Sequence, residues 1–295
     1  MALSLTRLRR TIILLSIVLA SALVLAAAPA AFSAEDNDVS IEEFQPITIS
    51  ENTLLDLEAV AEDLDPLTML MIFMQLEDLA EFDSNLDEDS FYDVDSLDAV
   101  NEHLGDTFVE PGYLPDGLSD GEAHFGVGDA GYATVTIDVA VARNITRLLE
   151  LPVDWLPDPS EHETVTMTID IPASGLAGWK SGLDTAMVGQ MALPQKDIPE
   201  SVDLDALRDA ILEDPRMPDE LADQLGAIDN WDETVPVPVP DGAEYEDLTI
   251  NGNAGFMLTM DGEGGVIAWE SNGVLHFVAG NVGADELQQI AESME

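Results

Sequence analysis

One run in the sequence has the residue types of a catalytic nucleophile. Residues 117–121 read Gly-Leu-Ser-Asp-Gly and match the G-x-S-x-G pattern, in which a sharp turn between a strand and a helix exposes the serine hydroxyl. Prolines precede this run and a strand-like stretch follows it, so the strand and helix that the pattern needs are not expected here. We therefore interpret Ser119 as a loop residue, and a serine hydrolase stays an alternative function.

A second run has the glycine spacing of a dinucleotide site. Residues 126–131 read Gly-Val-Gly-Asp-Ala-Gly and match G-x-G-x-x-G. That fingerprint needs a helix directly after it, because the helix N-terminus binds the phosphates. Residues 132–141 instead alternate between apolar and polar side chains, which predicts a half-buried strand. The glycines are therefore expected to form a hairpin loop, and no nucleotide cofactor is predicted.

Ligands for a metal ion are not grouped in the sequence. The chain has no cysteine, which excludes thiolate ligands, disulfides and a cysteine nucleophile, and its four histidines have no metal-binding spacing. The acidic run 81–98 is rich in carboxylates, but a calcium loop beginning at Asp83 would carry Glu88 and Val94 where glycine and glutamate are required. We predict a solvated acidic linker there, no metal or other cofactor, no catalytic residues, and hence a protein that is not an enzyme.

Charge divides the chain into two parts. Residues 1–34 contain three arginines and no acidic residue, whereas sixty acidic and only six basic residues follow, a net charge of −54. A positive start, a long apolar stretch and small residues before position 34 are typical of a secretory signal peptide. The apolar stretch is also close to the roughly 20 residues that span a bilayer, so an uncleaved N-terminal anchor is the alternative. Both interpretations predict a secreted, periplasmic or cell-surface protein. It is expected to touch the membrane only if this segment stays uncleaved, and then only through it.

The acidic part is predicted to fold and to carry a coat of carboxylates. Hydrophobic residues make up 46% of the chain, enough for a core, so charge alone does not predict disorder. Salt screens the repulsion within such a coat, and the pattern is typical of a halophilic organism; a calcium-rich or merely acidic surface is the alternative. Nucleic acid is not an expected partner, because phosphate binding needs clustered lysine and arginine. The expected partner is another exported or membrane protein.

One apolar run is a candidate for ligand binding. Residues 67–76 are apolar on nearly all sides and too few to cross a membrane, which predicts a buried core helix. The alternative is a methionine-rich face for an apolar ligand or partner, since methionine adapts to irregular surfaces. The candidate contact residues are Met69, Met71, Phe73, Met74 and, near the C-terminus, Trp269.

Periodicity and turn signals predict an α+β fold with a largely antiparallel sheet and packed helices. Three parts are expected: a signal peptide or anchor at 1–33, an acidic segment with two helices at 34–100, and an α+β domain at 101–295. Alternation predicts strands at 132–141, 164–171 and 188–193, with an edge strand or polyproline connector at 235–240. Helical spacing predicts helices at 143–151, 203–213, 218–228 and 284–294. Four short strands within 245–279 are separated in part by Asn251-Gly252 and Asn272-Gly273, both strong hairpin signals.

The C-terminal residues, from about 245 to 294, resemble a known domain. They contain strands, Trp269 in the run Gly-Val-Ile-Ala-Trp, the hairpin at Asn272-Gly273 and a final amphipathic helix. This arrangement is similar to an uncharacterised C-terminal domain of exported regulators that are associated with anti-sigma-factor-like proteins or lipoprotein-carrier-like folds. The resemblance implies no catalytic residues. It implies an exported binding or sensing protein, with a carrier of an apolar ligand as the alternative.

Overall fold

The computed structural model describes residues 41–50, 66–231, 233–260 and 264–294, so the predicted signal peptide or anchor and the predicted helix within 51–65 lie outside the described residues. The described part is an α+β fold built mainly from antiparallel strands. Its elements in chain order are β1 (Glu43–Ile49), α3 (Pro66–Leu79), β2 (Ala80–Ser84), η2 (Glu88–Ser90), β3 (Phe91–Val94), α4 (Leu97–Leu104), β4 (Ala123–Gly128), β5 (Gly131–Asp138), α5 (Val139–Leu148), β6 (Thr164–Ile171), β7 (Ser174–Ser181), β8 (Asp184–Ala192), β9 (Gln195–Asp197), α6 (Leu204–Leu212), α7 (Asp219–Gly226), β10 (Thr234–Pro240), β11 (Ala243–Ile250), β12 (Asn253–Met260), β13 (Gly265–Ser271), β14 (Val274–Gly280) and α8 (Ala284–Glu292).

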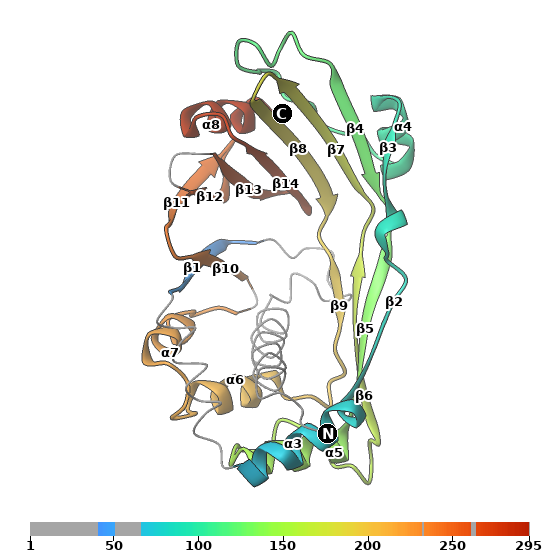
Figure 1. Cartoon of the computed structure of the whole chain (residues 1–295), viewed down its shortest axis with the longest axis vertical. Helices are drawn as coiled ribbons and strands as arrows, with labels where there is room; N and C mark the ends of the chain where they lie inside the picture. Colours follow the sequence, from blue (N-terminus) through green and yellow to red (C-terminus); the bar gives the residue numbers. More distant parts are fainter. Residues whose placement is uncertain (1–40, 51–65, 232, 261–263, 295) are drawn as a thin grey trace.

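Two sheets share four bent chain segments (Figure 1). The larger sheet has the order β11-β12-β13-β14-β8-β7-β4-β3, and the smaller has the order β2-β5-β6-β9. Each strand of the smaller sheet is joined by a short break to a strand of the larger one: β2 to β3, β4 to β5, β6 to β7 and β8 to β9. The same segments therefore run the length of the molecule and hold its two ends together.

The glycine run 126–131 lies at one of these breaks, and the predicted hairpin is wrong. β4 pairs with β3 and β7, whereas β5 pairs with β2 and β6, so the two strands do not pair with each other. A Cβ atom at Gly128 would collide with the side chains of Ser174 and Phe91, and one at Gly131 would collide with Leu86. The glycines thus allow close approach of neighbouring chain segments where the strand bends.

The acidic run 81–98 is also different from its prediction as a linker. It contains most of β2, all of η2 and β3, and the start of α4. The helix begins after Ser96, whose hydroxyl accepts a hydrogen bond from the N–H of Ala99 at 3.3 Å. Strands β2 and β3 lie at sheet edges, where charged side chains are tolerated because they reach water.

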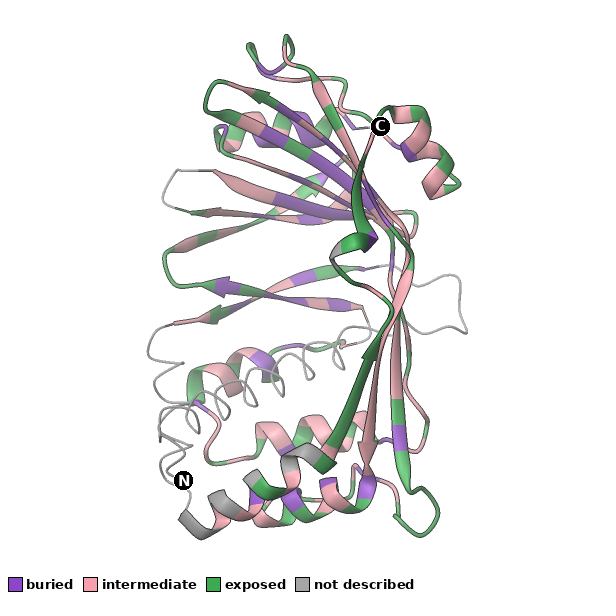
Figure 2. Ribbon diagram, turned by 45° about the vertical axis from the view of Figure 1, so that its right-hand side comes forward, coloured by how far each residue is buried: buried purple, intermediate pink, exposed green. Residues whose placement is uncertain are grey.

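The main core lies between one face of the larger sheet and the helices α4 and α8 (Figure 2). Ile267 and Val278 project from adjacent strands, and Leu287 and Ile290 project from α8; none of the four is exposed to solvent. Both asparagine–glycine turns form as predicted, with left-handed φ values of 51° at Asn251 and 54° at Asn272. The amide of Asn251 also donates to the carbonyls of Glu292 and Met294, which would otherwise be unpaired at the end of α8.

The valine–proline run forms β10, which confirms the predicted edge strand. It pairs in parallel with β1 in a two-stranded sheet. This pair packs against β12 and β11: the rings of Phe44 and Phe256 lie 5.1 Å apart, and the Tyr245 hydroxyl donates to the Phe44 carbonyl at 2.7 Å. A second small core forms where Ile47 meets α6 and α7.

Candidate functional site

The structure places the candidate contact residues at two distant positions. Met69, Met71, Phe73 and Met74 all belong to α3, which packs against α5, β2 and β5 at the opposite end of the molecule from β13 (Figure 1). Met71 is half-buried and Met74 is 62% exposed; the side chains of Met69 and Phe73 lie outside the described residues. Trp269 is only 2% exposed, so it contributes to the core, and the structure does not bring it to α3.

Trp269 belongs to a buried row that crosses three strands. It is the register partner of His276, which is the register partner of Gln190. The rings of Trp269 and His276 stack with centroids 5.1 Å apart and planes 13° apart. The Gln190 amide accepts from the N–H of Val109 at 3.0 Å and donates to the carbonyl of Thr107 at 3.1 Å. This row fixes the 105–122 connection to the sheet, and its polar groups serve packing.

His276 is the titratable member of this row. Its Nδ1 is buried and has no hydrogen-bond partner among the described residues. Burial lowers the pKa of the imidazole, because the charged form loses its hydration. The ring is therefore neutral in the folded protein at neutral pH, and protonation favours the unfolded chain.

Replacing His276 with phenylalanine should remove part of the acid sensitivity of the fold. The unfolded state takes up a proton as the pH falls below about 6.5, whereas the folded state takes it up only at lower pH. Stability is therefore lost as the pH falls from about 6.5 to the lower pKa of the folded protein. The total loss is about 1.4 kcal/mol for each unit by which burial lowers the pKa. Urea unfolding from pH 7.5 to pH 5, as a difference between wild type and His276→Phe, measures this loss.

The difference between the two proteins is needed because acid also neutralises carboxylates. The matched control is His162→Phe, which replaces an exposed histidine in the loop before β6. A pH dependence that His276→Phe leaves unchanged relative to that control would contradict the assignment.

The opposite face of the same strands is the best candidate for a binding surface. Along β8, Met187 is 38% exposed between Ala186 and Val188, which are 2% and 0% exposed. Along β14, Leu275 and Phe277 are half-buried on either side of buried His276. With Leu176 on β7 and Met191 on β8, these side chains form one apolar surface. We refer to Leu176, Met187, Met191, Leu275 and Phe277 as the open face.

Glycine flattens the open face. A Cβ atom at Gly189 would collide with the Phe277 ring and lie 2.7 Å from Leu176 Cδ2, so the ring lies across this glycine. A Cβ atom at Gly178 would have only the carbonyl oxygen of Ala186 within 4 Å, which leaves space beside Met187. Leu275 also packs with the β1–β10 pair, which therefore borders the open face.

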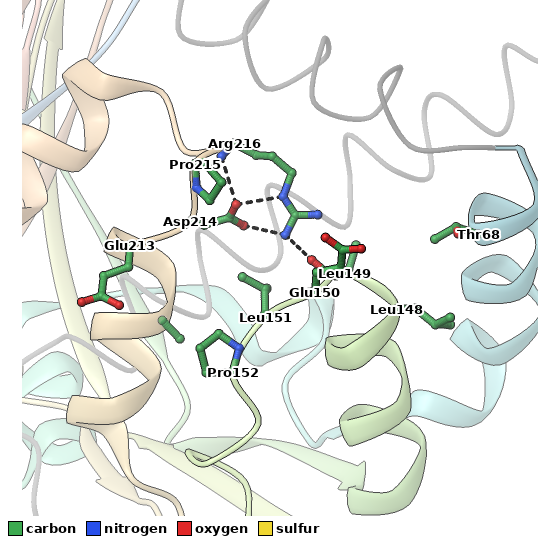
Figure 3. Close-up of a pocket in the computed structure, with 11 residues that line it drawn as sticks. Thr68, Leu148, Leu149, Glu150, Leu151, Pro152, Glu213, Asp214, Pro215 and Arg216 are labelled. Atoms are coloured by element: carbon green, nitrogen blue, oxygen red, sulfur yellow. Dashed lines mark hydrogen bonds and ion pairs between the residues drawn. The ribbon is translucent and has the colours of Figure 1, made fainter.

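A hollow of about 500 Å³ lies between the ends of α5 and α6 (Figure 3). The guanidinium of Arg216 donates to both carboxylate oxygens of Asp214 at 2.8 Å and to the carbonyl of Leu149 at 2.6 Å. Glu150 and Glu213 also line the hollow. Because Asp214 neutralises Arg216 and two further acids line the hollow, the geometry does not favour an anion. The contacts join the end of α5 to the chain that follows α6.

The nucleophile motif and the dinucleotide motif of the sequence have no supporting structure. Ser119 lies in a turn, as expected, with β4 rather than a helix after it. Within the ranges that the structure covers, no group of three histidine, aspartate or glutamate residues could hold a metal ion. The helices described in those ranges are all too short or too polar to cross a membrane.

Sequence reasoning missed the open face. Its signal is the run Val-Leu-His-Phe-Val-Ala at 274–279, which is apolar at both odd and even positions. Such a run indicates a strand with apolar side chains on both faces.

Comparison with known proteins identifies only the C-terminal part. Residues 240–294, which hold β11 to β14 and α8, match a family described as a domain of unknown function, DUF4367. This match confirms the predicted resemblance to an uncharacterised domain. No curated protein and no solved structure matches the chain.

Proposed function

We propose that the chain is a non-enzymatic binding protein that acts outside the cytoplasm and holds an apolar ligand on its open face, as a carrier or sensor would. One observation carries the proposal: the same strands that are closely packed on one face keep partly exposed apolar side chains on the other, with Met187 the most exposed at 38%. The N-terminal signal supports the location. The resemblance at 245–294 supports association with an exported or membrane regulator of the anti-sigma-factor type.

Apolar side chains on this face are unexpected without a ligand. Antiparallel strands that face water on one side normally place polar residues there. The chain has sixty acidic residues with which to do so, yet the exposed side of β8 carries Met187 and Met191. Contiguous apolar surface on a soluble protein usually marks a binding site. The excess of acidic residues also supports a high-salt environment for this protein, and high salt strengthens apolar contacts.

A charge placed on the open face should weaken binding of an apolar probe. We expect Met187→Glu to raise the Kd for the neutral dye Nile red by about tenfold or more, because a carboxylate would lose hydration beside the ligand. Fluorescence titration measures the Kd. The matched control is Leu183→Glu, which adds the same charge at a hairpin tip where Leu183 is 89% exposed.

Equal affinities of the two variants would contradict the proposal. Ser119→Ala tests the alternative that the protein is a serine hydrolase, because a large loss of esterase activity in that variant would establish an enzyme. Circular dichroism confirms that each variant is folded.

A further inference from the structure

Two consecutive edge strands, β2 of the smaller sheet and β3 of the larger sheet, carry exposed aromatic residues. Strand β2 pairs only with β5, and β3 pairs only with β4, so the outer backbone edge of each has no strand partner among the described residues. All five residues of β2 are exposed (Figure 2). Phe82 is 70% exposed, Phe91 is 58% exposed and Tyr92 is 45% exposed. An extended chain laid along this edge would gain both backbone hydrogen bonds and apolar contacts.

The edge is also strongly acidic. Eight acidic residues occur between 81 and 98, and no lysine or arginine occurs between 77 and 142. Glu81 and Asp93 lie on β2 and β3 and are exposed. A strand added here would therefore be drawn in by lysine or arginine side chains.

Charge on an edge strand often serves only to prevent unwanted pairing. That explanation accounts for Glu81 and Asp93 but not for the exposure of Phe82 and Phe91, because apolar residues on an edge promote pairing. A second copy of the chain is a poor occupant, since it would bring the same acidic edge and a net charge of −51. An extended basic segment would pair its charges with the acidic side chains and pack its apolar atoms against the aromatic ones.

We propose that the β2–β3 edge is a docking site for an extended basic segment of another protein, which adds a strand beside Phe82 and Phe91. The site is separate from the open face and does not depend on the apolar ligand. Residues 85–90 separate β2 from β3, so the docking strand can pair with either of two short stretches of backbone. Across this break, Asn85 Oδ1 accepts from the N–H of Tyr132 at 2.7 Å and the Ser90 carbonyl accepts from the N–H of Asp129 at 2.8 Å.

Synthetic peptides test the proposal on the whole protein. The probe is a fluorescein-labelled peptide of alternating lysine and valine, about six residues long, the usual length of a strand. The comparison peptides are the glutamate–valine analogue and a lysine–valine analogue that is N-methylated at alternate residues. We expect binding of the first peptide only, with slowed amide exchange confined to residues 80–94.

Variants locate the site. Phe82→Ser and Phe91→Ser should each weaken binding about tenfold. The control Leu183→Ser, which also removes an exposed apolar side chain, should leave the affinity unchanged. The double variant Glu81→Lys/Asp93→Lys should weaken binding much more than Asp184→Lys/Asp241→Lys, which makes the same charge change at exposed positions elsewhere.

Three results would overturn the proposal. Equal losses in the two charge-reversed proteins would show general attraction to an acidic surface. Amide exchange that is unchanged at 80–94 would place the peptide elsewhere. Self-association of the wild type that Phe82→Ser abolishes, measured by sedimentation velocity, would identify a second copy as the occupant.

Discussion

The free energy of unfolding should rise by several kcal/mol when sodium chloride is raised from about 0.1 M to about 3 M. The chain has sixty acidic and nine basic residues, so most of its carboxylates have no basic partner in any conformation. Folding brings these charges together, and their repulsion opposes it. The screening length falls from about 10 Å at 0.1 M to about 3 Å at 1 M, which removes most repulsion between surface charges.

The exposed ion pairs of Arg208 do little to offset this repulsion. Arg208 contacts Asp205 at 3.0 Å and Asp209 at 3.3 Å, but all three side chains are substantially exposed. Pairs of this kind contribute about 0–1 kcal/mol and weaken with salt. Salt therefore removes little attraction and much repulsion, and the net effect has a definite sign.

Urea unfolding at each salt concentration measures the effect. Salt also strengthens apolar burial, so a second protein is needed to isolate screening. Substituting exposed acids of the β2–β3 edge, the start of β8 and the turn after β10 by their amides (Glu81→Gln, Asp93→Asn, Asp184→Asn and Asp241→Asn) should raise stability at low salt and flatten the curve. A wild-type curve that is flat with salt would refute the halophilic interpretation.

Local signals in the sequence predicted local structure well. Asn272-Gly273 marks a hairpin whose turn requires positive φ at both residues, and that turn has the expected geometry. The α+β class and the antiparallel sheet followed from alternation at 132–141 and 164–171. These runs became β5 and β6, except that residues 139–141 already belong to α5. Helices α6 and α7 begin and end within two residues of their predicted limits.

Features that depend on distant partners could not be predicted in this way. Residues 80–84 pair with residues 133–137 of β5, about fifty positions away, so nothing local distinguishes them from an acidic linker. The glycines at 128 and 131 permit contacts with Ser174 and Leu86, which only the folded sheets bring near. The open face is defined by β7, β8 and β14 together, because no single strand shows which of its two apolar sides a helix will cover.

Leu287→Ala and Ile290→Ala should each lower the free energy of unfolding by about 2–5 kcal/mol. Both side chains are fully buried between α8 and the larger sheet. A Cβ atom at Gly265 would lie 3.4 Å from Leu287 Cδ1, so the helix sits close to the strands and the cavity cannot easily collapse. Urea unfolding at high salt measures the loss, with the exposed Gln289→Ala on the same helix as the matched control.

The extent of unfolding in these variants distinguishes two views of the C-terminal part. If β11 to β14 and α8 were an independent unit, amide exchange would accelerate only after residue 240. The structure predicts a wider effect. β14 pairs with β8, and the Ser293 hydroxyl accepts from the N–H of Tyr113 at 3.1 Å while its carbonyl accepts from Gly112 at 3.2 Å. Loosening α8 should therefore accelerate exchange in β7 and β8 as well, and Nile red binding to the open face should fall with it, because both faces belong to the same strands.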